Sequence, residues 1–110
     1  MKLPNADMAI IDPCKIRDYC LNPEHPRGKH KATIFKAVLG LTKSDAYVLI
    51  SEITREVQYT DCKVGEKDKY GQRYLVDIVL KINKKQAVVR TGWIVKQDES
   101  LPRLTTCYVL

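Results

Sequence analysis

The side chains best suited to proton transfer and phosphate chemistry lie in one short segment, Asn22–Ala32. It contains both histidines of the chain, His25 and His30, and two lysines, Lys29 and Lys31, flank His30. Metal-free cleavage of RNA needs a base for the ribose 2′-hydroxyl, an acid for the leaving 5′-oxygen and cations around the phosphate. Imidazole suits both proton transfers because its ordinary pKa lies near neutral pH. The segment therefore predicts His30 as the acid or base, with Lys31 stabilising phosphate charge.

A second segment, Arg90–Trp93, contains the one tryptophan of the chain. Arg90 could hold a phosphate with two parallel hydrogen bonds, and Thr91 could donate a further one. Trp93 could stack on a base or form the wall of a pocket, although a tryptophan in a small domain is equally often part of the core. Alternation places Thr91 and Trp93 on one face of the strand and Arg90 on the other, and it does not decide which face the helices cover.

Four further residues are candidates for binding the substrate, namely Lys29, His25, Arg103 and Thr105. Two of them have a simpler alternative. His25, which lies between two prolines, could be a hydrogen-bonding residue of the loop, and Arg103 could pair with a carboxylate. His30 itself could be a solvated residue in the first turn of a helix. For the catalytic interpretation, His30, Arg90 and Thr91 must converge on one cleft.

Charge favours a polyanionic partner. The chain has 110 residues and a net charge of +6, from 19 Lys and Arg against 13 Asp and Glu.

We expect one domain spanning residues 1–110, located in the cytoplasm, because neither a membrane-spanning run nor a secretory signal is present. The four cysteines contain no Cys-x-x-Cys pair and are interpreted as free thiols. We expect no metal and no cofactor. A zinc site from Cys20, His25 and His30 would lack a fourth ligand, and Asp77 is the only acid inside an apolar strand pattern.

Local signals predict helices in the first half of the chain. Residues 1–11 are expected to form an extended arm against the body. Asp12 followed by proline indicates the start of a short helix that ends before Pro23. A second helix is expected from residue 28 or 29 to a C-cap at Gly40, and Thr42-x-x-Asp45 indicates a capping box for a third helix that ends near residue 57.

The second half has the period of two that is typical of strands. Strands are expected at 59–64, 73–82, 86–95 and 103–109, with a charged loop at 65–71 and a hairpin turn at 83–85. Along 73–82, alternate residues from Tyr74 to Ile82 are apolar and share one face. The order predicts an α+β fold, with two to three N-terminal helices packed on a four-stranded antiparallel sheet.

Several motifs together resemble a bacterial domain family of unknown function that occurs alone and at the C-termini of adhesin-like toxins. They are Leu3–Asp7, Asn22–Pro26, His30–Ala32, Arg90-Thr91-x-Trp93 and Pro102–Thr105, and they cover nearly the whole chain. The layout is also similar to ribonuclease toxins of the barnase/EndoU/colicin/RelE class, more specifically to the colicin D type. That type cuts tRNA with a lysine/histidine cluster at a helix edge and a Ser-x-Trp on a strand. Lys29–Lys31 resembles the first element, and Thr91–Trp93 resembles the second with threonine in place of serine.

These observations predict a metal-independent endoribonuclease toxin domain that cleaves tRNA or another structured RNA and leaves a 2′,3′-cyclic phosphate. A toxin of this kind implies a cognate inhibitor, which we expect to be small and acidic. The main alternative is a non-catalytic module that binds RNA or protein, such as the neutralising member of a toxin pair.

Overall fold

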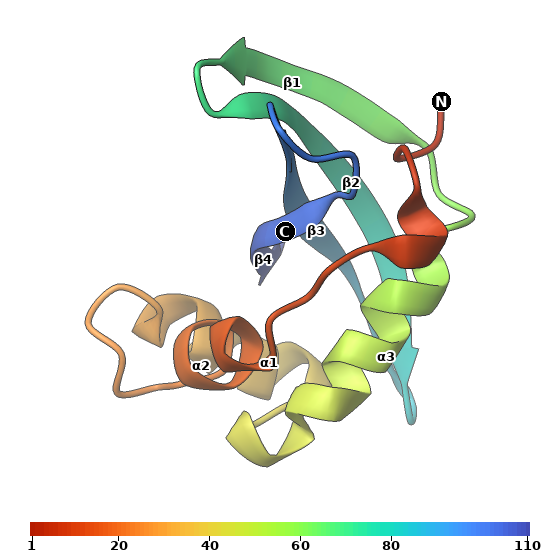
Figure 1. Cartoon of the computed structure of the whole chain (residues 1–110). Helices are drawn as coiled ribbons and strands as arrows, with labels where there is room; N and C mark the ends of the chain where they lie inside the picture. The colour runs from red at the N-terminus through yellow and green to blue at the C-terminus, as the bar shows by residue number, and fades with distance from the viewer.

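The helices precede the strands along the chain and lie together on one side of the sheet (Figure 1). The computed structural model describes residues 1–110, and the fold is α+β with a four-stranded antiparallel sheet, as predicted. The helices are α1 (Pro13–Lys15) with its π-helical continuation η2 (Ile16–Cys20), α2 (Lys29–Leu39) and α3 (Ala46–Glu56), and two short 3-10 turns, η1 (Ala6–Met8) and η3 (Lys43–Asp45), precede α1 and α3. The strands are β1 (Cys62–Asp68), β2 (Gly71–Ile82), β3 (Lys85–Lys96) and β4 (Arg103–Val109).

The helix ends lie where the sequence predicts them. The Asp12 side chain accepts a hydrogen bond from the Cys14 backbone N–H at 2.9 Å, which caps α1. α2 ends at Gly40, whose φ of 69° is a left-handed conformation that favours glycine. The capping box is also present, because the Asp45 carboxylate accepts from the Thr42 backbone N–H at 2.8 Å. These caps satisfy backbone groups that a helix end would otherwise leave unpaired.

The sheet is a meander in which β1, β2, β3 and β4 follow each other in space as in sequence. A two-residue turn at Asn83–Lys84 joins β2 to β3, and Asn83 has a φ of 56°, a conformation that asparagine tolerates. The prediction for β1 was wrong in its bounds. The strand begins at Cys62 and includes most of the segment predicted as a charged loop, because its charged residues lie on an exposed edge strand where charge is compatible with β structure.

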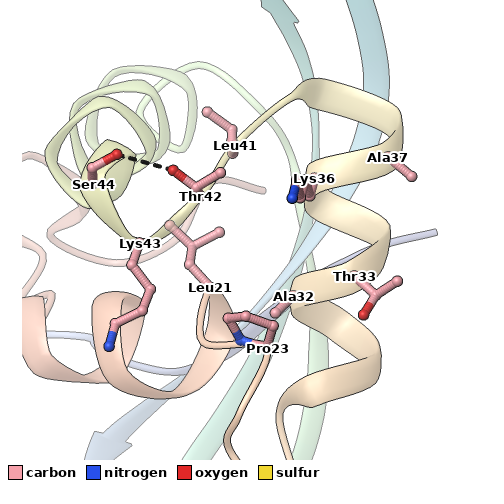
Figure 2. A pocket seen from close by; sticks show the side chains of 10 residues that line it. All are labelled: Leu21, Pro23, Ala32, Thr33, Lys36, Ala37, Leu41, Thr42, Lys43 and Ser44. Atoms are coloured by element: carbon pink, nitrogen blue, oxygen red, sulfur yellow. Dashed lines mark hydrogen bonds between the residues drawn. The ribbon is translucent and has the colours of Figure 1, made fainter.

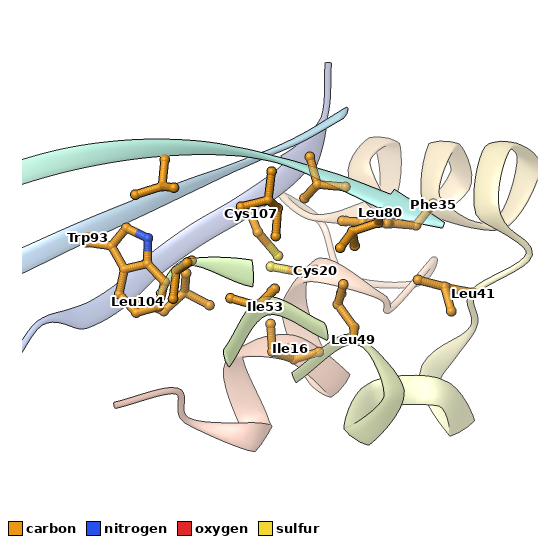
Figure 3. Close-up of a cluster of buried hydrophobic side chains, with 14 of the residues drawn as sticks. Ile16, Cys20, Phe35, Leu41, Leu49, Ile53, Leu80, Trp93, Leu104 and Cys107 are labelled. Atoms are coloured by element: carbon orange, nitrogen blue, oxygen red, sulfur yellow. The ribbon is translucent and has the colours of Figure 1, made fainter. Parts of the chain in front are cut away.

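The core lies between the helices and the covered face of the sheet (Figure 3). The alternating residues of β2 face this core as predicted, with Val76, Ile78 and Leu80 fully buried. Phe35 of α2 and Ile53 of α3 pack into the same cluster. The helices do not cover the opposite face of the sheet (Figure 1), where Val79 and Val88 are exposed and Ile94 is buried.

The N-terminal arm packs against the body as expected, although η1 interrupts its predicted extended conformation. Leu3 is buried, Lys2 forms an isolated bridge with Asp61, and Ile10 pairs in parallel with Arg103. The arm therefore contacts both edge regions of the sheet.

Candidate functional site

Thr91 and Trp93 lie on the covered face of β3, so the structure places the tryptophan in the core. Trp93 is 1% exposed and Thr91 is fully buried. The indole Nε1–H of Trp93 donates to Thr91 Oγ1 at 2.8 Å, and the Thr91 hydroxyl donates to the Val76 carbonyl at 2.7 Å. The polar atoms of both side chains are therefore occupied by each other and by the backbone.

Arg90 lies on the open face, opposite Asp77 of β2 and Tyr108 of β4 in the strand register. Its Nε and Nη2 donate to the two Asp77 carboxylate oxygens at 2.8 and 2.9 Å. This bidentate pair raises the pKa of the Arg90 guanidinium, with Tyr108 adding to the effect, and lowers the pKa of Asp77. Asp77 thus fixes the direction of Arg90, and one edge of the guanidinium stays beside the Tyr108 side chain.

Lys31 extends from α2 to the same part of the sheet. Its ammonium donates a hydrogen bond to the Tyr19 hydroxyl and lies 4.6 Å from the centre of the Tyr19 ring. It also lies 5.7 Å from the centre of the Tyr108 ring. β4 is an edge strand, so Lys31 reaches Tyr108 at an edge of the sheet. The two tyrosines, from η2 and β4, therefore hold one ammonium between them.

His25 contacts this group through Tyr19. The two rings meet edge to face with their centres 4.9 Å apart. The Nδ1 atom of His25 accepts backbone N–H bonds from Arg27 and Gly28, both at 3.0 Å, which assigns the ring hydrogen to Nε2. Gly28 is needed for this loop because a Cβ atom there would lie 2.2 Å from the Tyr19 carbonyl oxygen.

We call these six residues the polar row: Asp77, Arg90, Tyr108, Lys31, Tyr19 and His25. They come from β2, β3, β4, α2, η2 and the loop before α2. The row contains two cations, two phenol hydroxyls and one imidazole, all half-buried. Such a set can bind a phosphate and can donate hydrogen bonds to its oxygens.

The remaining predicted residues lie outside the polar row. His30 and Lys29 are exposed on the first turn of α2. Arg103 forms a two-point pair with Glu99, at 2.8 and 2.9 Å, so its alternative interpretation as an ion-pair residue is confirmed. Thr105 lies beside Gly92. The expected convergence of His30, Arg90 and Thr91 is therefore not observed, because Thr91 and Arg90 lie on opposite faces of the sheet.

Sequence reasoning did not select Tyr19, Tyr108 or Asp77 for the site. Asp77 could have been found, because a two-residue turn at Asn83–Lys84 fixes the register that places it opposite Arg90. The tyrosines carried no such signal. Tyr19 follows the apolar spacing of a helix, and its approach to Tyr108 depends on how the helices pack on the sheet.

A groove in another part of the molecule is separate from these residues. It has a volume of about 840 Å³ and runs beside α2 toward η3 (Figure 2). None of the predicted site residues and none of the polar row line it. No cluster of three or more His, Cys, Asp or Glu side chains is arranged to hold a metal ion. The helices are all too short or too polar to cross a membrane.

Comparisons with known proteins give a family and a related structure. The model of a domain family of unknown function, DUF6883, matches residues 2–110. A solved structure described as a contact-dependent growth inhibition toxin–immunity protein complex from Klebsiella pneumoniae 342 is similar, with a TM-score of 0.69 and 18% identity, over 93% of this chain and 100% of the matched chain. At this identity the likeness shows a shared fold. No curated protein matches the chain.

Proposed function

We propose that this chain, which belongs to the DUF6883 family, is a metal-independent endoribonuclease toxin domain whose site is the polar row. Its substrate would be tRNA or another structured RNA, and its product would carry a 2′,3′-cyclic phosphate. The observation that carries this proposal is the convergence of Lys31 and Arg90, from two distant parts of the chain, on Tyr108. The fold shared with a chain of a toxin–immunity complex supports a role as one member of such a pair, either the toxin or the immunity protein.

The geometry suggests a division of roles within the row. Lys31 and Arg90 stabilise the charge that develops on the phosphate in the transition state. Tyr19 lies beside Lys31, and Tyr108 lies beside both Lys31 and Arg90, so their hydroxyls supply groups for hydrogen bonding and proton transfer. His25 has Nδ1 occupied by backbone N–H groups, so Nε2–H is the atom left for the substrate. Asp77 acts on Arg90 and is a positioning residue.

The chain's own charge supports a polyanionic substrate and an acidic inhibitor. A net charge of +6 favours RNA through attraction and counterion release. The same cations would attract a small acidic immunity protein, and covering the polar row would be the simplest route to inhibition. Action on RNA places the working site in the cytoplasm of a target cell.

The test is RNA cleavage in excess EDTA, with total tRNA as substrate and fragments resolved on a denaturing gel. Lys31→Met should lower cleavage by about 10²–10³-fold, because an ammonium beside the phosphate is lost. His30→Ala is the matched control from the adjacent position of α2, and it should change the rate by less than about threefold, as is usual for an exposed side chain without partners.

Two outcomes would contradict parts of this proposal. Cleavage that is lost in His30→Ala and kept in Lys31→Met would return the catalytic role to the histidine that the sequence predicted. A purified, inhibitor-free protein that leaves every RNA class intact would reject the nuclease.

The alternative is a non-catalytic module that binds RNA or neutralises a toxin. It is favoured by the separation of His30, Arg90 and Thr91, which the catalytic interpretation of the sequence required to converge. Expression in bacteria discriminates the two functions, because an active nuclease should arrest growth and Lys31→Met should relieve the arrest. Harmless expression of the parent, together with RNA binding that persists without cleavage, would support the binding module.

A further inference from the structure

Two buried cysteines lie directly behind the polar row, and the row does not use them. Cys20 ends η2 and Cys107 lies in β4, and both side chains are fully buried. Figure 3 shows their sulfur atoms facing each other in the centre of the core. The interaction of the two thiols lowers the pKa of Cys20 and raises the pKa of Cys107, and burial raises the pKa of Cys107 further.

The positions of these cysteines in the chain connect them to the polar row. Cys20 directly follows Tyr19, and Cys107 directly precedes Tyr108. The two tyrosines flank Lys31, and the Lys31 charge also acts on both thiols. A movement of the Cys20 or Cys107 backbone therefore also moves the neighbouring tyrosine.

We propose that Cys20 and Cys107 form a reversible disulfide that joins η2 to β4 and controls the spacing of Tyr19 and Tyr108 around Lys31. The S–S bond is about 2.05 Å long, which is much shorter than a contact between two thiols, so oxidation pulls η2 toward β4. The expected effect of this disulfide on RNA cleavage rests on the proposed function. The formation of the disulfide does not depend on that function.

The chemistry is thiol–disulfide exchange with a small disulfide such as oxidised glutathione. The Cys20 thiolate attacks the oxidant, forms a mixed disulfide and releases one thiol. Cys107 then attacks the Cys20 sulfur, which forms the internal disulfide and releases the second thiol. The two cysteines are oxidised, the oxidant is reduced to two thiols, and the two thiol hydrogens pass to the products. Because both cysteines are buried, the exchange requires local opening of the segment from α1 to α2.

In the experiment, the reduced protein is treated with oxidised glutathione, both in buffer and during dilution from mild urea. Intact mass should show the loss of two hydrogen atoms, and peptide mapping should find Cys20 linked to Cys107. The variant Cys62→Ala is the matched control, because it removes another buried thiol and should keep the link. Cys20→Ala should abolish it. Glutathione adducts alone, a link between other cysteines or no oxidation in either condition would overturn the proposal.

A second measurement tests what the link does to the molecule. The oxidised protein should unfold at a higher temperature than the reduced protein and return to the lower midpoint after dithiothreitol treatment, because the crosslink closes a long loop. RNA cleavage should fall at least about tenfold on oxidation and recover on reduction, since shifts of about 1 Å at a catalytic group cost up to about 10²-fold. Equal rates of RNA cleavage in the oxidised and reduced proteins would overturn the proposal that the disulfide controls the spacing of Tyr19 and Tyr108. If the reduced parent cleaves no RNA, the proposed function fails. The mass data still decide whether Cys20 and Cys107 form the disulfide.

Discussion

Thr91→Val tests whether Thr91 holds the core together or contacts the substrate. Valine has nearly the same shape as threonine, so the variant removes the hydroxyl without leaving a cavity. The indole N–H of Trp93 then has no acceptor, and an orphaned buried donor costs about 1–3 kcal/mol. The Val76 carbonyl loses a bond worth about 1 kcal/mol, and the added methyl group returns about 0.8 kcal/mol. We expect a net loss in the free energy of unfolding of about 2 kcal/mol.

The assay is urea unfolding followed by tryptophan fluorescence and circular dichroism. With an m-value typical of small proteins, the loss should move the midpoint down by roughly 1 to 2 M. Thr106→Val is the matched control, because the Thr106 hydroxyl is buried without a partner, and its removal should leave stability unchanged or raise it. RNA cleavage per folded molecule should be unchanged in Thr91→Val.

A double-mutant cycle with Trp93→Phe isolates the bond between the two side chains. Phenylalanine has no N–H, so adding Thr91→Val to Trp93→Phe should cost less than Thr91→Val costs in the parent, by about 1–2 kcal/mol. Full stability in Thr91→Val, combined with loss of cleavage, would refute this reasoning. That result would mean that the Thr91 hydroxyl contacts the phosphate, as the sequence pattern predicted.

Three further predictions concern the loop, the open face and a helix cap. Gly28→Ala should destabilise the protein by about 1–3 kcal/mol, measured by urea unfolding, because its Cβ would lie 2.2 Å from the Tyr19 carbonyl oxygen; an unchanged midpoint would show that the loop can move aside. Arg90 lowers the pKa of Asp77, so this carboxylate contributes stability that is complete above its unfolded pKa of about 3.9 and is lost as pH falls through the lower folded pKa. Asp77→Asn should therefore lose less stability than the parent between about pH 5 and about pH 2 in thermal melts, and parallel pH curves would contradict the ion pair. Asp45→Ala removes the carboxylate of the capping box and should cost about 1 kcal/mol by the same unfolding assay, whereas a cost near zero would mean that solvent replaces the cap.

The order and type of the elements could be predicted because their signals are local. Asp12 and Gly40 mark helix ends through hydrogen bonds and backbone angles that involve neighbouring residues only. The alternation in β2 marks a strand with one buried face, whatever covers that face. The start and end of β1 could not be placed, because an edge strand has no buried alternation and its charged residues have the composition of a loop.

The composition of the candidate site depended on contacts between residues far apart in sequence. Alternation placed Thr91 and Arg90 on opposite faces of β3, but only the packing of the helices decided that Thr91 is covered and Arg90 is open. In the same way, Tyr19 and Tyr108 meet at Lys31 because η2 and α2 pack against the β4 edge. The sequence by itself determined which elements form, since caps and periodicity act over a few residues, and the tertiary structure decided which side chains share a surface, since that depends on how whole elements bury their apolar faces together.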